Sequence, residues 1–342
     1  MKTAVTYEAT LARLCQDDER VVVLTAENRA AIRGLPALLG DRFVDVGICE
    51  QTMVGMAAGF ALRGRIPVVH ALATFLTLRA FEFIRSDVGI GHLPVKLIGG
   101  VAGLLSEANG PTHQALDDLA VMRAIPGMSI VCPADEGELC AALPSVLAAP
   151  GPVYVRHNAR PGGDIVHQPF VLGRAERLTQ GQGEGDDIQV LALGFLVPEA
   201  LEAAGLLASD GLSVGVTNMR SLVPIDEEAI VAAARAARLL VTVEDHFLVG
   251  GLYQTVSEIL VRRGLAGVRV HPIGFDGRFF APGLLADVMQ HEGMTAAGLA
   301  GRIESAWARM HTVAPAAQSG SLANTVTAFS AVQPFPGGPS LA

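Results

Sequence analysis

Three stretches of the sequence hold side chains that could do chemistry. Glu50 opens the segment "EQTMVGMAAGFAL", which carries no other charge; His113 follows the rigid turn "GPT"; and Phe75 begins the aromatic-rich segment "FLTLRAFEFIR". A carboxylate in apolar surroundings needs a partner, because burying an unpaired charge is costly. Each residue also has a structural explanation. Glu50 could be a first-turn acid stabilised by the helix dipole, His113 a structural loop residue and Phe75 part of the core.

The elements that must position these residues alternate along the chain. Short apolar runs predict strands at 20–25, 42–46, 65–72, 93–100, 128–133, 151–156, 188–194, 212–219, 238–246 and 268–274. Helical patterns lie between them at 7–16, 50–63, 74–90, 115–124, 135–149, 197–209, 226–237 and 250–263. Continuous apolar strands separated by helices are typical of a parallel sheet covered on both faces. The sequence therefore predicts an α/β fold with two doubly wound, mainly parallel-sheet domains.

The predicted domain boundaries follow from changes in composition. A Gly-rich polar connector after residue 156 separates a domain over 1–165 from a second domain over 166–310. Residues 311–342 form a low-complexity tail rich in Pro, Gly, Ser and Ala, for which we expect a poorly ordered extension or a strand of chain along a partner.

Composition excludes several classes of partner. The net charge of −9 comes without a basic stripe, which argues against nucleic acid. No apolar run is long enough to span a bilayer, and the first twenty residues lack the apolar core of a signal peptide. The four cysteines, Cys15, Cys49, Cys132 and Cys140, show no metal-ligand spacing and indicate buried thiols in a reducing cytoplasm. The segment "VGGLYQTV" (249–256) is either a tight turn or a helix start that could meet an anion.

Taken together, the motifs resemble the C-terminal half of transketolases, from about residue 3 to 310. The resemblance rests on "DVGICEQTMVGMAAGFALRG", "TFLTLRAFEFIR", "SEANGPTHQALDDLAVMRAIPGM" and "VTVEDHFLVGGL", in this order. It implies a pyrimidine-binding domain followed by the transketolase C-terminal domain, with thiamine diphosphate as the cofactor. The implied reaction is transfer of a two-carbon ketol unit from a ketose donor to an aldose-type acceptor.

The resemblance also implies a role for individual residues. Glu50 matches the glutamate that hydrogen-bonds N1′ of the aminopyrimidine and promotes its imino tautomer, which would supply the carboxylate with its partner. Phe75 matches the aromatic residue that packs on the pyrimidine ring, and Phe81 is the candidate for a second ring contact. Glu27 replaces the aspartate usual near the thiazolium. His113 matches the histidine that contacts the substrate hydroxyl or oxyanion, so Glu50 and His113 are the expected catalytic residues.

Departures from the family pattern concern the substrate. Val101 and Tyr7 stand where a histidine and a phosphate-binding arginine are usual, and Asn109 replaces an aspartate that reads a donor hydroxyl. Arg156 and Arg160 are candidates for a second substrate-binding arginine, beside His113 and Asn109. Part of the sugar-phosphate clamp is therefore missing. We expect an acceptor other than a plain pentose 5-phosphate, such as a modified, nucleotide-linked or unphosphorylated sugar.

The diphosphate-binding motif of the family, GDG followed by Asn, does not occur in this sequence. We therefore expect a split transketolase, active only as a heteromer with an N-terminal, diphosphate-binding subunit that holds most of the Mg²⁺ ligands, and assembled as a heterotetramer. The alternatives are a 2-oxoacid dehydrogenase E1 β-type subunit, for which the "GPTHQ" loop is atypical, and a non-catalytic paralogue acting as a structural or regulatory subunit. A deoxyxylulose-phosphate synthase fits less well, because those chains include the diphosphate domain.

Overall fold

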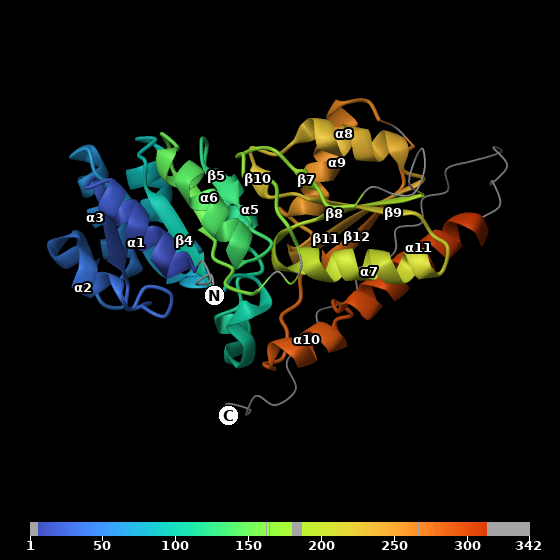
Figure 1. Cartoon of the computed structure of the whole chain (residues 1–342), viewed down its shortest axis with the longest axis horizontal. Coiled ribbons are helices and arrows are strands. Elements are labelled where there is room, and N and C mark those ends of the chain that lie inside the picture. Colours follow the sequence, from blue (N-terminus) through green and yellow to red (C-terminus); the bar gives the residue numbers. More distant parts are fainter. Residues whose placement is uncertain (1–5, 162, 164, 180–186, 266, 313–342) are drawn as a thin grey trace, which may run out of the picture.

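The first half of the chain is built on a seven-stranded sheet, on the left of Figure 1. The computed structural model describes residues 6–161, 163, 165–179, 187–265 and 267–312. The strand order is β10-β5-β6-β4-β3-β1-β2, and every pair is parallel except β10 with β5. The strands are β1 (Val21–Thr25), β2 (Phe43–Asp45), β3 (Ile66–Leu72), β4 (Lys96–Gly100), β5 (Ser129–Val131), β6 (Val153–Arg156) and β10 (Ser221–Val223).

Helices cover both faces of this sheet, as a parallel sheet requires. One face carries α3 (Glu50–Leu62), η2 (Phe75–Arg79), α4 (Phe81–Phe83), η3 (Ile84–Gly89) and α5 (Asp118–Arg123). The other face carries α1 (Tyr7–Asp17), α2 (Leu35–Leu39) and α6 (Glu136–Ala148). The short helices η1 (Gly40–Arg42) and η4 (Leu104–Thr112) lie in connections. Asp135 caps α6 by accepting the N–H of Glu138 at 2.8 Å.

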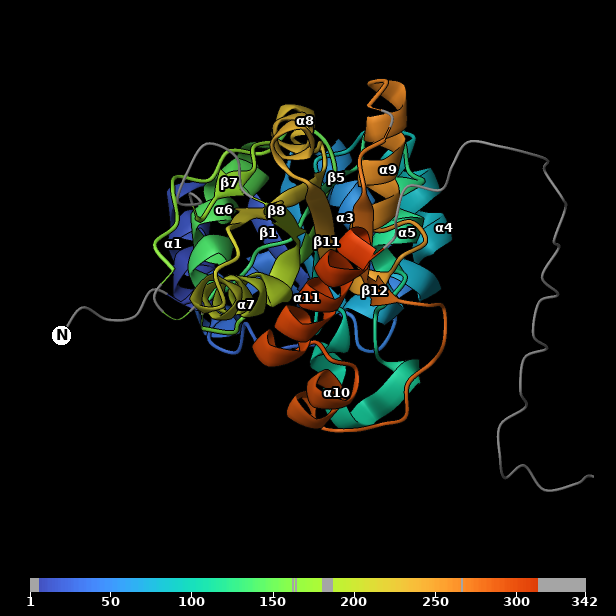
Figure 2. The same cartoon turned by 90° about the vertical axis from the view of Figure 1, so that its right-hand side faces the viewer.

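The second half repeats this plan with a five-stranded sheet in the order β12-β11-β8-β9-β7. Only the pair of β7 with β9 is antiparallel. The strands are β7 (Glu176–Arg177), β8 (Ile188–Ala192), β9 (Val214–Asn218), β11 (Leu239–Phe247) and β12 (Val270–Phe275). After η5 (Gly194–Leu196), the helices α7 (Val197–Ser209) and α11 (Ala296–Thr312) cover one face, and α8 (Glu227–Ala236) and α9 (Leu252–Arg262) the other (Figure 1). The helix α10 (Leu285–His291) lies beside η4, away from α8 and α9 (Figure 2).

The hydrophobic core is continuous between the two sheets. Leu97 and Met53, from the first sheet and α3, belong to the same buried cluster as Leu191, Met219 and Leu240 from the second half. Because apolar burial stabilises in proportion to the area removed from water, this shared cluster holds the halves together as well as each sheet to its helices.

The predicted α/β class with two mainly parallel sheets is confirmed, and the predicted strands and helices occur in the expected order. The helix expected over 115–124 begins only at Asp118, because Ala115 pairs with Gly103 in an isolated β-bridge. The helix expected over 74–90 contains π-helical turns at η2 and η3. Sequence patterning did not identify α2, α10, α11 or β10.

The boundary expected near residue 165 stays a prediction. Beyond that point, β10 returns to the first sheet, where Ser221 pairs with Val131 and Val223 with Ile130. The expected disorder of the tail concerns residues 313–342, which lie outside the described residues, as does part of the connector. Within the described ranges, no helix combines the length and the apolar character needed to cross a membrane.

One burial prediction is wrong, that for Cys49, and α3 also leaves apolar side chains exposed. Met56 is 38% and Leu62 73% exposed, and Ile48 just before the helix is 71% exposed. Cys49 is half-buried, with its Sγ 2.9 Å from Thr52 Oγ1, whereas the other three cysteines are buried as expected. The exposed face of α3 therefore carries isolated apolar side chains among exposed polar ones such as Thr52.

Candidate active site

Three of the four residues with proposed cofactor roles line one cavity of about 310 Å³. It lies where β1, β3 and α3 come together, and its lining includes Glu27, Glu50 and Phe75, with Asn28 and Ile48 beside them. Glu27 follows the carboxyl end of β1, and the carboxyl edge of a parallel sheet is where such folds bind ligands. Its backbone has a positive φ of 63°, and its N–H donates to Asp45 Oδ1 at 3.1 Å. The cavity combines two carboxylates, one aromatic ring and apolar walls.

Glu50 has a partner within the chain, Arg79, which the sequence gave no reason to single out. Glu50 is 2% exposed, and Arg79 Nη1 donates to its Oε2 at 2.8 Å. The guanidinium also lies over the Phe75 ring, 4.2 Å from its centroid. A planar cation therefore stacks on the aromatic ring and pairs with the buried carboxylate. The only sequence signal for this contact is the spacing of four residues between Phe75 and Arg79 on one helical segment.

His113 lies beside this cavity. Its ring makes an edge-to-face contact with Phe75, with 5.0 Å between centroids, and its Nδ1 is 2.8 Å from Thr112 Oγ1. Asn109 is exposed, and its Nδ2 donates to the Ser106 carbonyl at 3.0 Å. The structure thus brings His113 to Phe75, which lines the cavity with Glu50, while Asn109 is exposed.

Phe81 and Tyr7 do not join the site. Phe81 is partly buried against the main core and does not line the cavity, so the expected second ring contact is not seen. Tyr7 is fully buried on the opposite face of the sheet, where its hydroxyl lies 2.7 Å from His70 Nε2. Tyr7 stands where the family usually has a phosphate-binding arginine, and its buried side chain offers no group to a substrate.

Arg156 is not available to substrate, contrary to the sequence-based expectation. It is 4% exposed and pairs with two buried carboxylates: Nη2 and Nε donate to Asp118 at 2.5 and 2.9 Å, and Nη1 donates to Asp245 at 2.7 Å. Burial opposes ionisation, but Arg156 holds the pKa of Asp118 below its usual range. For Asp245 burial dominates and raises the pKa to about 6. Arg156 therefore ties the first sheet to β11.

Arg160 also lies away from Glu50. It lines a different cavity of about 540 Å³, together with Glu107 and Glu199. Its guanidinium is 3.8 Å from Glu199 Oε1 and lies over the Phe195 ring. The nearby carboxylates reduce its value as a phosphate ligand, because like charges would meet any bound anion.

The helix start at "VGGLYQTV" is already capped by a side chain of the same protein, Glu244, whose pKa burial raises to about 8. Glu244 accepts the N–H groups of Leu252 and Tyr253 at 2.6 and 2.8 Å, at the first turn of α9. Gly251 is required here, because a Cβ would lie 1.9 Å from Glu244 Oε2. Of the two interpretations that the sequence left open, the structure favours the tight turn, because the carboxyl group of Glu244 already accepts the N–H groups that a bound anion would need.

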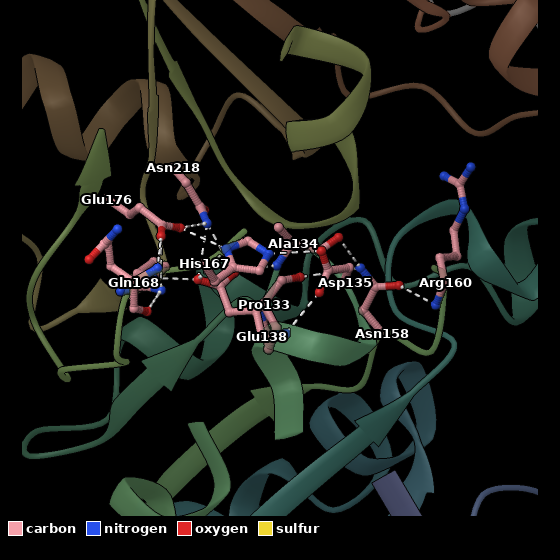
Figure 3. Close-up of polar contacts among 11 residues, drawn as sticks. Pro133, Ala134, Asp135, Glu138, Asn158, Arg160, His167, Gln168, Glu176 and Asn218 are labelled. Carbon is pink, nitrogen blue, oxygen red and sulfur yellow. Dashed lines mark hydrogen bonds and ion pairs between the residues drawn. The ribbon is translucent and has the colours of Figure 1, made fainter. Parts of the chain in front are cut away.

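A second charged cluster joins the halves at the connector, shown in Figure 3. The His167 ring lies between two carboxylates, with Nε2 at 2.8 Å from Asp135 Oδ2 and Nδ1 at 2.7 Å from Glu176 Oε2. Because both ring nitrogens face carboxylates, the imidazole donates from both and is held protonated. Burial lowers its pKa, but the carboxylates outweigh this and raise it to about 9. The other groups near it are Glu138, Arg220 and Asn218, and Glu138 accepts hydrogen bonds from both Arg220 and Asn218.

This cluster predicts how stability depends on pH. The pKa of His167 is about 9 in the folded protein against 6.5 when unperturbed, so its contribution is complete below pH 6.5 and is lost as pH rises through about 9. We expect His167→Gln to lower the free energy of unfolding at pH 6.5 by on the order of 2–4 kcal/mol, as measured by urea denaturation. The difference should shrink at pH 9.5.

The control for this prediction is His291→Gln, because the His291 side chain is 83% exposed. It should leave the free energy of unfolding within about 0.5 kcal/mol of wild type at both pH values. A gap between wild type and His167→Gln that stays constant from pH 6.5 to 9.5 would show that the imidazole is not protonated in the cluster.

Comparisons with known proteins cover both halves of the chain. The family model described as "Transketolase, pyrimidine binding domain" matches residues 1–160, and "Transketolase, C-terminal domain" matches residues 179–299. A 6-deoxy-6-sulfo-D-fructose transketolase subunit, SqwH of Clostridium sp. (strain MSTE9), is 36% identical over 85% of this chain and 90% of its own length.

Two further relatives differ in length. The 1-deoxy-D-xylulose-5-phosphate synthase 1 of Geobacter sulfurreducens is 36% identical over 90% of this chain but only 48% of its own, so the chain spans about half of that synthase. The solved structure of a split gene transketolase, an inactive beta4 tetramer, has a TM-score of 0.78 and 31% identity. The match covers 88% of this chain and 96% of that one.

Proposed function

The chain belongs to the transketolase family of thiamine-diphosphate enzymes, and from this premise we propose that it is the pyrimidine-binding subunit of a split transketolase. The proposed reaction is transfer of a two-carbon ketol unit from a ketose to an aldose-type acceptor. The observation that carries the proposal is the single cavity at which Glu27, Glu50 and Phe75 meet.

The residues of this cavity fit an aminopyrimidine. Glu50 offers a buried carboxylate that can hydrogen-bond a ring nitrogen, and Phe75 offers a flat apolar surface for a ring. Arg79 now makes both contacts, stacking on Phe75 and pairing with Glu50. An aminopyrimidine is likewise planar and rich in nitrogen, so it could make the same two contacts as the Arg79 guanidinium: stacking on Phe75 and a hydrogen bond to Glu50. Arg79 would have to yield the face of Phe75 to such a ring.

When bound, thiamine diphosphate supplies the carbanion-stabilising chemistry that ketol transfer needs. The contribution of this chain is orientation and proton handling. Glu50, at its Oε atoms, would hold the proton shared with the pyrimidine ring nitrogen, in a low-dielectric position that strengthens the bond. Phe75 would fix the plane of the ring. His113, against the edge of Phe75, would face the substrate oxygen.

The proposed partner is supported by exposed apolar side chains near the site. Ile48, which lines the cavity with Glu50, is 71% exposed, and Met56 and Leu62 on α3 are also exposed; burial of such side chains against another subunit is favourable. We propose that this subunit is the diphosphate-binding half, which brings the ligands for Mg²⁺, and that the assembly is a heterotetramer. The split gene transketolase, an inactive beta4 tetramer, supports the idea that such chains are inactive without their partner.

We propose that the substrate is a specialised sugar, because the chain lacks part of the set of residues that binds the sugar phosphate in this family. Arg156 is committed to Asp118 and Asp245, Tyr7 is buried, and Val101 carries no charge. The name of the Clostridium relative refers to a sulfonated fructose, which supports variation of the sugar end within this group.

Calorimetry with the purified chain tests the split arrangement. Alone, the chain should bind thiamine diphosphate with Mg²⁺ weakly, with a Kd above about 0.1 mM, since a single ring pocket leaves the charged diphosphate unbound. Addition of a diphosphate-binding transketolase subunit that assembles with this chain should tighten the Kd at least about a hundredfold.

Thiamine without its diphosphate serves as the matched ligand, because it contacts only what this chain provides. Its affinity should change far less when the partner is added. Micromolar, Mg²⁺-dependent binding of thiamine diphosphate by the isolated chain would refute the split arrangement.

A further inference from the structure

Asn28 lines the same cavity as Glu27, Glu50 and Phe75, but the proposed cofactor contacts leave it without a role. In the described part of the chain, neither its Oδ1 nor its Nδ2 has a hydrogen-bond partner. Asn28 is half-buried, and neither amide atom belongs to the unpaired side-chain atoms that protein fully encloses. The amide is therefore free to bind a ligand in the cavity.

The turn after β1 does not need this amide. Thr25 Oγ1 donates to the Asn28 carbonyl at 3.1 Å, and the Arg29 N–H donates to the Glu27 carbonyl at 3.0 Å. Asparagine is common in turns because its side chain bonds to the nearby backbone, and the Asn28 side chain makes no such bond. The turn is held by other groups, so its geometry does not explain an asparagine here.

The amide lies against the end of β4. A Cβ on residue 100 would be 2.9 Å from Asn28 Nδ2, so Gly100 leaves the space that the amide fills. Val101 follows, and its side chain offers no hydrogen bond. The chain then runs through η4 to His113, which contacts Phe75. Asn28 thus lies where the segment that leads to the proposed substrate contact leaves the sheet.

The lining of the cavity defines what the amide can bind. Of its seven lining residues, all of them described, only Glu27, Glu50 and Asn28 have polar side chains, and none is a cation. An ionised carboxylate accepts hydrogen bonds and repels an anion, whereas an amide both donates and accepts. A hydroxyl group also donates and accepts, so it fits Asn28 better than a phosphate or a sulfonate does.

We propose that Asn28 binds the hydroxyl group of the two-carbon ketol unit and thereby selects ketose donors over ketoses that lack this hydroxyl. The inference rests on the proposed function, which brings the carbonyl end of a ketose to the cavity that Glu50 lines. A site built to hydrogen-bond a substrate hydroxyl discriminates against the analogue without it, because the site's own polar groups are then left unpaired.

D-xylulose and 1-deoxy-D-xylulose test the proposal, because these two uncharged ketoses differ only in the hydroxyl on C1. In the partner complex with thiamine diphosphate and Mg²⁺, Asn28→Leu should raise the KM for D-xylulose as donor about tenfold, through loss of a neutral hydrogen bond. The Ki of 1-deoxy-D-xylulose as a competitor and the Kd of thiamine diphosphate should each stay within about twofold of wild type.

A second variant separates the hydrogen bond from crowding of the cavity. Asn28→Ala removes the amide without adding bulk and should raise the KM for D-xylulose as much as Asn28→Leu. Both variants should unfold within about 3 °C of wild type, because no described side-chain bond is lost. The matched control is Gln16→Leu, at an exposed position of α1, which should keep the wild-type KM.

The possible outcomes separate the role of Asn28 from the proposed function. An unchanged KM in Asn28→Ala, or equal losses with both ketoses, would overturn the role of Asn28. A weaker Kd of thiamine diphosphate in Asn28→Ala would overturn it as well, because the amide would then contact the cofactor. A wild-type complex that neither binds thiamine diphosphate nor transfers from D-xylulose would overturn the proposed function itself.

Discussion

Glu50→Gln should lower kcat of the partner complex at least about a hundredfold, the usual contribution of a positioned proton-transfer group. The amide keeps the shape of the side chain but cannot hold the proton shared with a ring nitrogen. It also leaves Arg79 without its ion pair. Steady-state rates with saturating thiamine diphosphate would measure the loss, with circular dichroism as the check that the variant is folded.

The matched control is Glu82→Gln. Glu82 is exposed, and its only described contact is the hydroxyl of Ser86 at 2.8 Å. Its kcat should stay within about twofold of wild type, because surface substitutions of this kind rarely perturb a fold. If Glu50→Gln were as active as Glu82→Gln, the non-catalytic, structural or regulatory role would be the better interpretation.

Arg156→Met should destabilise the chain by about 3–5 kcal/mol, because it leaves two carboxylates buried without their cation. Asp118 is fully buried and Asp245 is 1% exposed, so neither can recover its hydration without opening the interface. Urea unfolding at pH 7 measures the loss. At pH 5 the loss should be smaller, because Asp245, whose pKa burial raises to about 6, then becomes neutral.

Arg13→Met is the control, since Arg13 forms an exposed i,i+4 pair with Asp17 at 3.0 Å. Its effect should stay below about 0.5 kcal/mol. Arg156→Lys keeps the charge but not the two-pronged geometry and should fall between the two. Unchanged stability of Arg156→Met together with a raised KM would return Arg156 to the role of a substrate ligand that its sequence position suggested.

The fold was accessible from sequence because its signal is local. Each strand of the parallel sheets is a short apolar run, and each helix between them has its own pattern, so order and type could be predicted. The short strand β10 (Ser221–Val223) could not be predicted, because three residues at a sheet edge carry no periodicity and their pairing is set by the rest of the chain.

The site divides in the same way. Family resemblance brought Glu50, Phe75 and His113 together, and the structure places them within one region. The partners of Arg156 could not be predicted, because Asp245 is 89 residues away in sequence. Arg79 was missed for a different reason: its place at the site depends on its contacts with Glu50 and Phe75, and these contacts are a property of the packed structure.

The position of β10 also has a consequence for how the protein is made. A chain emerging from the ribosome completes β1 to β6 well before residues 221–223 appear, and domains generally fold from the N-terminal side. Until then the outer edge of β5 presents unpaired backbone groups, the kind of edge that recruits strands from other chains. The first half of this protein therefore has an open sheet edge until residues 221–223 are synthesised. During that time, strands of neighbouring nascent chains could pair with β5 in the place that β10 later takes.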